Sequence, residues 1–102
     1  MNPYILTKDA ENDLRDIARY TLEKHGAKQL QTYRKKINSR LNKIAKGEVI
    51  ARSFSRRFPQ VLVTQCEHHF IFYITDNVQK PLIIGIIHEN RDMVARVKER
   101  PL

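Results

Sequence analysis

The spacing of the apolar residues changes at Gly47, and this change constrains the fold more than any other feature of the sequence. Upstream of Gly47, apolar residues recur every three or four positions, which places them on one face of an α-helix. Downstream, they gather in short runs rich in β-branched residues, as in strands. A chain that changes from helical to strand periodicity in this way is expected to pack helices against a sheet, which is the α+β class of fold.

Two helices are predicted upstream of Gly47. The first covers Lys8–Lys24 and follows a short strand at Pro3–Thr7, whose last residue can cap the helix N-terminus. Gly26 is a typical residue for ending such a helix. The second helix has an apolar stripe at three- and four-residue spacing, formed by Leu30, Tyr33, Ile37, Leu41 and Ile44. Because the link between the two helices is very short, they are expected to form an antiparallel hairpin.

Three strands are predicted in the second half of the chain, at Val61–Cys66, His69–Thr75 and Pro81–His88. The connections Glu67–His68 and Asp76–Lys80 are too short to cross over the sheet, so the three strands should form an antiparallel meander. The last two strands are almost continuously apolar, which indicates that they are buried on both faces or central in the sheet.

The complete order of elements is therefore β-α-α-β-β-β. Val49–Phe54 is either a further short strand or an extended lead-in, and a short final helix is possible over Arg91–Arg100, which Pro101 cannot extend. The predicted fold is an antiparallel helical hairpin packed on a small, mostly antiparallel curved sheet. At 102 residues the chain is expected to form one domain, spanning residues 1–102.

Positive charge is concentrated in the middle of the chain. The net charge is +8, and residues 27–60 hold ten Lys or Arg but a single acid, Glu48. Basic residues surround the apolar stripe of the second helix, and a loop at Ala51–Pro59 then interleaves arginines with Phe54 and Phe58. Such a segment attracts anions, whether nucleic acid, ribosome, membrane surface or an acidic protein. An ordinary solvated surface is the alternative, and the charge pattern does not decide between the two.

Charge and expected exposure define the candidate residues for binding a target or a partner. They are Lys36, Arg40 and Lys43 on the second helix, Arg52, Arg56, Arg57 and Phe58 in the loop that follows, and His88, Arg91 and Met93 at and beyond the end of the last strand.

Other chemistry finds little support in the sequence. Cys66, His68 and His69 are close together, but structural zinc needs four ligands, usually in two spaced pairs. The sequence contains neither a phosphate-binding loop nor a nucleophile elbow. His88 and Glu89 are neighbours at the end of a strand and should point to opposite faces, so they do not form a ready-made acid–base pair. No metal or cofactor is therefore expected.

The sequence also bears on where the protein acts. A lone cysteine cannot form an internal disulfide, which is typical of a reducing compartment. Neither an export signal nor an apolar run long enough to cross a bilayer is visible. The expected location is the cytoplasm, with no membrane partner.

Four stretches resemble the ParE branch of the RelE/ParE family of bacterial toxin–antitoxin toxins. They are "YILTKDAENDLRDIARYTLEKHG" at the start, Y-x3-I-x3-L-x2-IA on the second helix, "HFIFYI" on a late strand and "IIGIIHENRDM" at the end. The resemblance extends over nearly the whole chain and implies the same helical hairpin on a sheet. It also implies a growth-inhibiting protein of the cytoplasm, neutralised by a cognate antitoxin that should be acidic and partly disordered.

The ParE-like resemblance implies a non-enzymatic poison of DNA gyrase that has no catalytic residues. One alternative is a ribosome-dependent mRNA endoribonuclease of the RelE type, in which His88 and Arg91 would be catalytic. Another is a small basic binding module that merely shares the fold. RelE-type relatives have an aromatic or histidine acid/base near the C-terminus, because cleavage needs a proton carrier beside cations. Here no tyrosine follows Tyr73 and no histidine follows His88. This departure favours a binding inhibitor, and direct binding of nucleic acid is left open.

Overall fold

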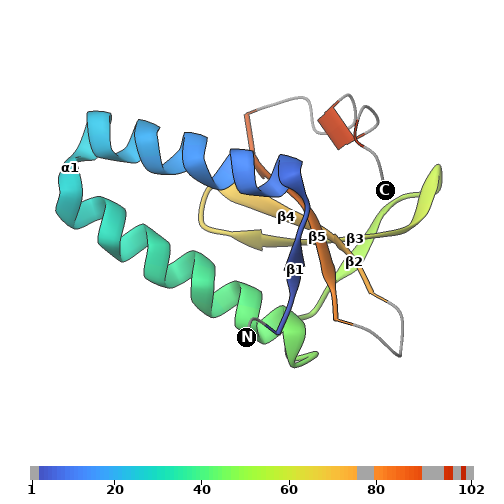
Figure 1. Ribbon diagram of the computed structural model, residues 1–102. Helices are drawn as coiled ribbons and strands as arrows, with labels where there is room; N and C mark the ends of the chain where they lie inside the picture. Colours follow the sequence, from blue (N-terminus) through green and yellow to red (C-terminus); the bar gives the residue numbers. More distant parts are fainter. Residues whose placement is uncertain (1–2, 76–79, 91–95, 98–99, 101–102) are drawn as a thin grey trace.

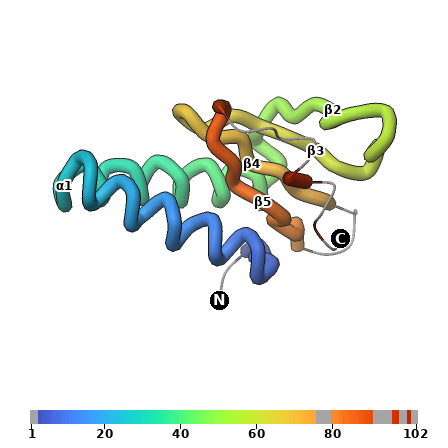
Figure 2. Tube along the Cα trace, turned by 90° about the horizontal axis from the view of Figure 1, so that it is seen from above, coloured from blue at the N-terminus to red at the C-terminus, as the bar shows by residue number. Residues whose placement is uncertain are grey.

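The computed structural model describes residues 3–75, 80–90, 96–97 and 100. Its elements follow the order β1 (Ile5–Leu6), α1 (Lys8–Ala45), β2 (Arg52–Ser55), β3 (Phe58–Cys66), β4 (His69–Ile74) and β5 (Leu82–His88). The strands form one sheet in the order β1-β5-β4-β3-β2, and α1 lies along one side of it (Figures 1 and 2). The α+β fold predicted from the sequence is confirmed.

α1 turns back on itself at Gly26, so it consists of two helical arms (Figure 1). Gly26 has φ 87° and ψ 172°, a conformation that interrupts the helix and that residues with a Cβ rarely adopt. The first arm, residues 8–25, begins after Thr7, whose Oγ1 accepts a hydrogen bond from the Ala10 N–H at 3.1 Å. The second arm, residues 27–45, starts directly after the glycine. The predicted cap and the predicted hairpin are confirmed, with a link of a single residue.

β3, β4 and β5 form the predicted antiparallel meander. The turn between β3 and β4 is Glu67–His68, as predicted, and it brings Cys66 opposite His69. Glu67 adopts the left-handed conformation with φ 55°, which allows so tight a turn. β1 extends the sheet beyond β5 and pairs with it in parallel orientation.

The segment between Gly47 and β3 differs in part from the prediction. β2 pairs antiparallel with β3 through a two-residue turn at Arg56–Arg57, with Ser55 opposite Phe58. The segment predicted as an arginine–phenylalanine loop is therefore a β-hairpin, and β3 begins at Phe58 rather than at Val61. The register shifts between Ser53 and Ser55, which is why the strand alternation is weak in the sequence here.

Both faces of the sheet are buried. The face toward α1 packs Ile37, Leu41 and Ile44 of the second arm against Ile71, Ile83 and Ile86 of the sheet. On the opposite face, Val61, Phe72 and Ile84 are covered by Phe54, Phe58 and Val97. This double burial accounts for the nearly continuous apolar sequences of β4 and β5, and it confirms the prediction made from them.

β1 pairs with only the first two residues of β5, and among the described residues the rest of this edge is closed by two side chains rather than by a strand. Asp13 of α1 accepts a hydrogen bond from the Ile86 N–H at 2.9 Å, and Arg100 donates one to the Ile84 carbonyl at 3.0 Å. The guanidinium and the carboxylate also pair with each other at 2.6 and 3.0 Å. Gly85 makes room for this contact, since a Cβ there would lie 2.6 Å from Arg100 Nη1.

Two further predictions can be compared with the described residues only. Among the described residues, no helix combines the length and apolar character that a membrane span requires. Of the final helix predicted over Arg91–Arg100, only Arg96, Val97 and Arg100 are described, so most of that prediction lies outside the described residues.

Candidate functional site

The second arm of α1 presents most of its positive charge on one side, which we call the basic face. It consists of Lys28, Lys35, Lys36, Arg40, Lys43 and the C-cap residue Lys46. At 100° per residue these side chains fall within about 140° of the helix circumference, next to the apolar stripe that packs on the sheet. All are exposed except Arg40, which is half-buried. The structure therefore brings the predicted residues Lys36, Arg40 and Lys43 together on one surface.

A pocket of about 300 Å³ lies on the basic face, between the second arm and the β3–β4 turn. It is lined by Lys35, Lys36, Ser39, Arg40, Lys43, Cys66 and Glu67. Glu67 pairs with Lys36 at 3.1 Å and is the single acid of this lining. The Cys66 thiol is buried and donates to the Lys36 carbonyl at 3.7 Å. Burial raises the pKa of Cys66, which Arg40 partly opposes, so this cysteine is suited to packing rather than to nucleophilic attack.

A second hollow, the interarm groove, lies between the two arms of α1 and has a volume of about 490 Å³. Its lining includes apolar side chains of both arms, namely Leu14, Ile17, Leu30 and Ile37. Arg15, Arg19 and Arg34 also line it. Arg34 therefore belongs to this groove, although its sequence neighbour Lys35 belongs to the basic face.

Four further predicted residues, Arg52, Arg56, Arg57 and Phe58, lie in the β2–β3 hairpin, which projects away from α1 (Figures 1 and 2). Arg52, Arg56 and Arg57 are exposed, the last two at the turn. Phe58 is half-buried and stacks on Phe54, with 6.1 Å between the ring centroids. The Phe58 ring therefore helps to cover the sheet.

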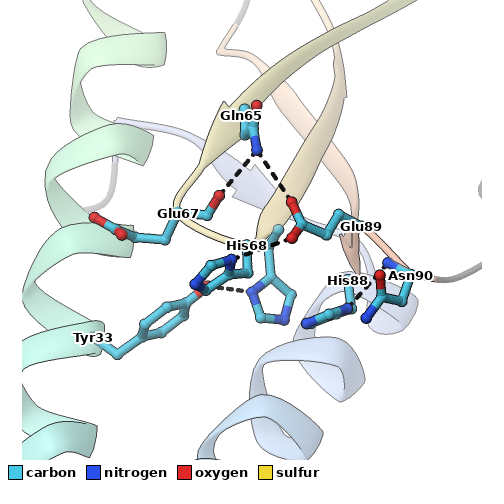
Figure 3. Close-up of polar contacts among 8 residues, drawn as sticks. Tyr33, Gln65, Glu67, His68, His88, Glu89 and Asn90 are labelled. Carbon is cyan, nitrogen blue, oxygen red and sulfur yellow. Dashed lines mark hydrogen bonds and ion pairs between the residues drawn. The ribbon is translucent and has the colours of Figure 1, made fainter.

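A polar cluster that sequence analysis missed lies where β5 ends, and it joins Tyr33 of α1 to three histidines (Figure 3). The Tyr33 hydroxyl is hydrogen-bonded to Nδ1 of His69. The ring of His69 meets that of His88 edge-on, with 5.1 Å between centroids, and the ring of His68 lies 6.4 Å from that of His88. His68 Nδ1 is 3.2 Å from a carboxylate oxygen of Glu89.

Two members of the polar cluster, Tyr33 and His69, are not suited to acid–base catalysis near pH 7. Burial, assisted by His88 and His68, lowers the pKa of His69 to about 4, and burial raises the pKa of Tyr33. Both groups are therefore neutral at pH 7, and neither has the pKa near 7 that efficient proton transfer requires. We interpret the contact between Tyr33 and His69 as a link between α1 and the sheet.

His88, the predicted residue at the end of β5, is part of this cluster. Its Nδ1 accepts a hydrogen bond from the Asn90 N–H at 3.1 Å, whereas Glu89 contacts His68 (Figure 3). His88 and Glu89 therefore have different partners. Within the part of the chain that the structure describes, no group of three or more His, Cys, Asp or Glu is placed to hold a metal ion.

The predicted residues thus fall into three separate regions, which are the basic face, the β2–β3 hairpin and the polar cluster. Arg91 and Met93 lie outside the described residues. The cluster was missed because Tyr33 fits the apolar stripe of its helix. A signal was nevertheless present, since a two-residue turn before His69 places it at the end of the sheet where His88 ends its own strand.

Comparisons with known proteins agree on the kind of molecule. The family model described as "ParE toxin of type II toxin-antitoxin system, parDE" matches residues 4–93. The chain is 37% identical over 100 residues to Toxin ParE of Escherichia coli, and the match covers 98% of this chain and 97% of that protein. The solved structure "Chromosomal ParDE TA system from P. aeruginosa" matches with a TM-score of 0.68 and 15% identity, covering 85% of this chain and 98% of that chain. At that identity the structural match shows a likeness of fold.

The helical hairpin on a five-stranded sheet, taken with these matches, defines a toxin of a bacterial type II toxin–antitoxin system. The matched residues 4–93 include every element from β1 to β5. Within this class the chain belongs to the ParE toxin family, and the resemblance identified from its sequence is confirmed.

Proposed function

We propose that this toxin inhibits growth by binding DNA gyrase and trapping its cleaved complex with DNA, without catalysing a reaction itself. The observation that carries the proposal is the 37% identity to Toxin ParE over nearly the whole of both chains. The polar cluster supports a binding mechanism, because Tyr33 and His69 are not tuned for proton transfer near pH 7. The proposed location is the cytoplasm, and residues 1–102 are proposed to act as one domain.

The second part of the proposal is a cognate antitoxin that binds in the interarm groove. The groove is lined by apolar side chains together with Arg15, Arg19 and Arg34. A segment with one apolar and one acidic face would be complementary to it, and a disordered acidic segment that folds on binding has this character. Because such a partner binds only the native toxin, it should raise the melting temperature, and added salt should slow its association.

A supercoiling and DNA-cleavage assay with purified gyrase tests the target. The expected result is loss of supercoiling with accumulation of cleaved DNA, both reversed by the antitoxin. Tyr33→Phe and His88→Ala should keep most of this activity, whereas a mechanism that used either group as an acid or base would lose about 100-fold or more. Unaffected gyrase together with mRNA cleavage on ribosomes would contradict the proposal and support the nuclease alternative.

A pair of neighbouring substitutions tests the antitoxin site. Arg34→Glu reverses a charge in the interarm groove, and Lys35→Glu makes the same change on the basic face. Antitoxin binding, measured by calorimetry, should weaken in the first variant and change little in the second. Equal effects of the two substitutions, or equal melting temperatures with and without saturating antitoxin, would contradict the assignment.

A further inference from the structure

The basic face gathers six cations on one side of the second arm, and the proposed function gives it no partner. Its cations form two rows along the helix, Lys28, Lys35 and Lys46 in one and Lys36, Arg40 and Lys43 in the other. From Lys28 to Lys43 the face is about 22 Å long at 1.5 Å per residue. No Asp or Glu occurs from Ala27 to Gly47. The face therefore suits an extended, regularly charged anion.

The composition of the basic face argues against a protein as that anion. Protein interfaces depend on apolar or aromatic anchors near their centre. Residues 28–46 are all described, and their large apolar side chains are buried or half-buried. The exposed large apolar residues of the described chain lie elsewhere, at Ile5, Tyr20, Leu22 and Ile50. Binding to phosphates, by contrast, requires cations alone.

We propose that the basic face binds the phosphate backbone of duplex DNA. A duplex is stiff and carries one charge per about 1.7 Å of its axis. Its phosphates can therefore contact a straight double row of cations along the whole length of the basic face. Binding of single strands relies on exposed aromatic rings that stack on bases. Tyr33 is the one aromatic residue of the second arm, and its hydroxyl is engaged with His69. The contacts would be to the backbone and therefore independent of sequence.

Glu67 sets a limit on this binding. Its carboxylate lies 3.1 Å from Lys36 Nζ and within the pocket of the basic face. A phosphate that approached Lys36 would meet this negative charge. Removal of the charge by Glu67→Gln should therefore strengthen the binding of DNA, which a merely solvated lysine surface would not be expected to show.

The biological role of this contact rests on the proposed function. A toxin bound to gyrase lies close to the DNA that the enzyme holds. Contacts from the basic face to that backbone would retain the toxin on the cleaved complex, and they would leave the interarm groove free for the antitoxin.

The test is the equilibrium binding of the full-length toxin to a fluorescent 30-base-pair duplex of mixed sequence, measured by anisotropy from about 50 to 200 mM salt. The variants are the double substitution Lys35→Ala/Lys43→Ala and the single substitution Glu67→Gln. Lys24→Ala and Glu23→Gln, at exposed positions on the first arm, are the matched controls. Circular dichroism checks that each variant is folded, and alanine is compatible with the helix.

The double variant should bind the duplex more weakly. The slope of log K against log salt should fall in magnitude by about 0.9 for each lost phosphate contact, or roughly 2 for two contacts. Glu67→Gln should bind several-fold more tightly, and the controls should match the parent. Absence of duplex binding at low salt, or equal effects of test and control substitutions, would overturn the inference. The inference would also be overturned if the double variant lost antitoxin or gyrase binding but kept its affinity for DNA, since the basic face would then be a protein site.

Gyrase poisoning is measured on the same samples. DNA binding without poisoning would refute the proposed function alone, and poisoning without DNA binding would refute this inference alone.

Discussion

Replacing Asp13 by alanine tests the closure of the β5 edge. In the native protein the Asp13 carboxylate accepts three hydrogen bonds, one from the Ile86 N–H and two from Arg100. The side chains of Arg100 and Asp13 are only 12% and 16% exposed. Asp13→Ala therefore leaves a largely buried guanidinium without its counter-charge and a backbone N–H without its acceptor. Removing one partner of a buried ion pair costs about 3–5 kcal/mol, and the residual exposure favours the lower end, about 3 kcal/mol.

This loss is large for a chain of 102 residues, because domains of this size have free energies of unfolding of about 5–15 kcal/mol. At roughly 4–8 °C per kcal/mol, the melting temperature should fall by about 12–24 °C. Urea denaturation followed by circular dichroism measures the free energy directly. Asp16→Ala is the matched control, since it removes the same charge at an exposed position of the same arm, and it should stay within about 0.5 kcal/mol of the parent.

A double-mutant cycle identifies the cause of the loss. Arg100→Ala should cost less than Asp13→Ala, about 2 kcal/mol, because the carboxylate would keep its bond to Ile86. The double variant should lose less than the sum of the single variants, with a coupling of about 1–3 kcal/mol. A loss below 1 kcal/mol for Asp13→Ala, or strictly additive single effects, would refute the claim that these side chains close the edge.

Three further predictions concern stability. Burial lowers the pKa of His69 to about 4 from 6.5, so the unfolded chain binds a proton more readily than the native one. The free energy of unfolding should therefore fall as the pH drops from about 6.5 to 4, by about 1–2 kcal/mol after allowance for the half-exposed ring. A His69→Phe variant should lose that part of the pH dependence. Gly85→Ala should destabilise the protein by about 1–3 kcal/mol in urea denaturation, because the new Cβ would lie 2.6 Å from Arg100 Nη1 and would displace a guanidinium that Asp13 and the Ile84 carbonyl hold; a stabilised variant would contradict this. Gly26→Ala should cost about 1–3 kcal/mol through backbone strain, because φ 87° with ψ 172° is a conformation that only glycine adopts readily and nothing lies within 4 Å of the new Cβ; an unchanged melting temperature would refute that reasoning.

The helices and the meander could be predicted because their signals are local. The three- and four-residue spacing of the second arm, the Gly26 break and the tight turn at Glu67–His68 each occur within a few positions of the sequence. The β2–β3 hairpin was recognised only in part. β2 is four residues long, and its register shift removes the alternation on which strand prediction depends.

The contacts that sequence analysis missed join residues far apart in the chain. Tyr33 and His69 are 36 positions apart, and Asp13 and Arg100 are 87 apart. Tyr33 fits an apolar stripe, and Asp13 is one of several acids near a helix N-terminus, so neither side chain has a local pattern that identifies its partner. The basic face was predicted from charge alone. Its separation from the interarm groove depends on how the two arms pack, which the sequence does not reveal.

The closure of the β5 edge also has a consequence for folding kinetics. Since its two side chains are 87 positions apart, forming their contact requires the closure of nearly the whole chain, at a high cost in chain entropy. We expect this contact to be absent from the folding transition state and to form last. Asp13→Ala should then accelerate unfolding and leave the folding rate almost unchanged, giving a φ-value near zero. Until the contact forms, a folding molecule exposes unpaired backbone N–H and C=O groups at β5. Association with a second, incompletely folded copy is most favourable during this interval.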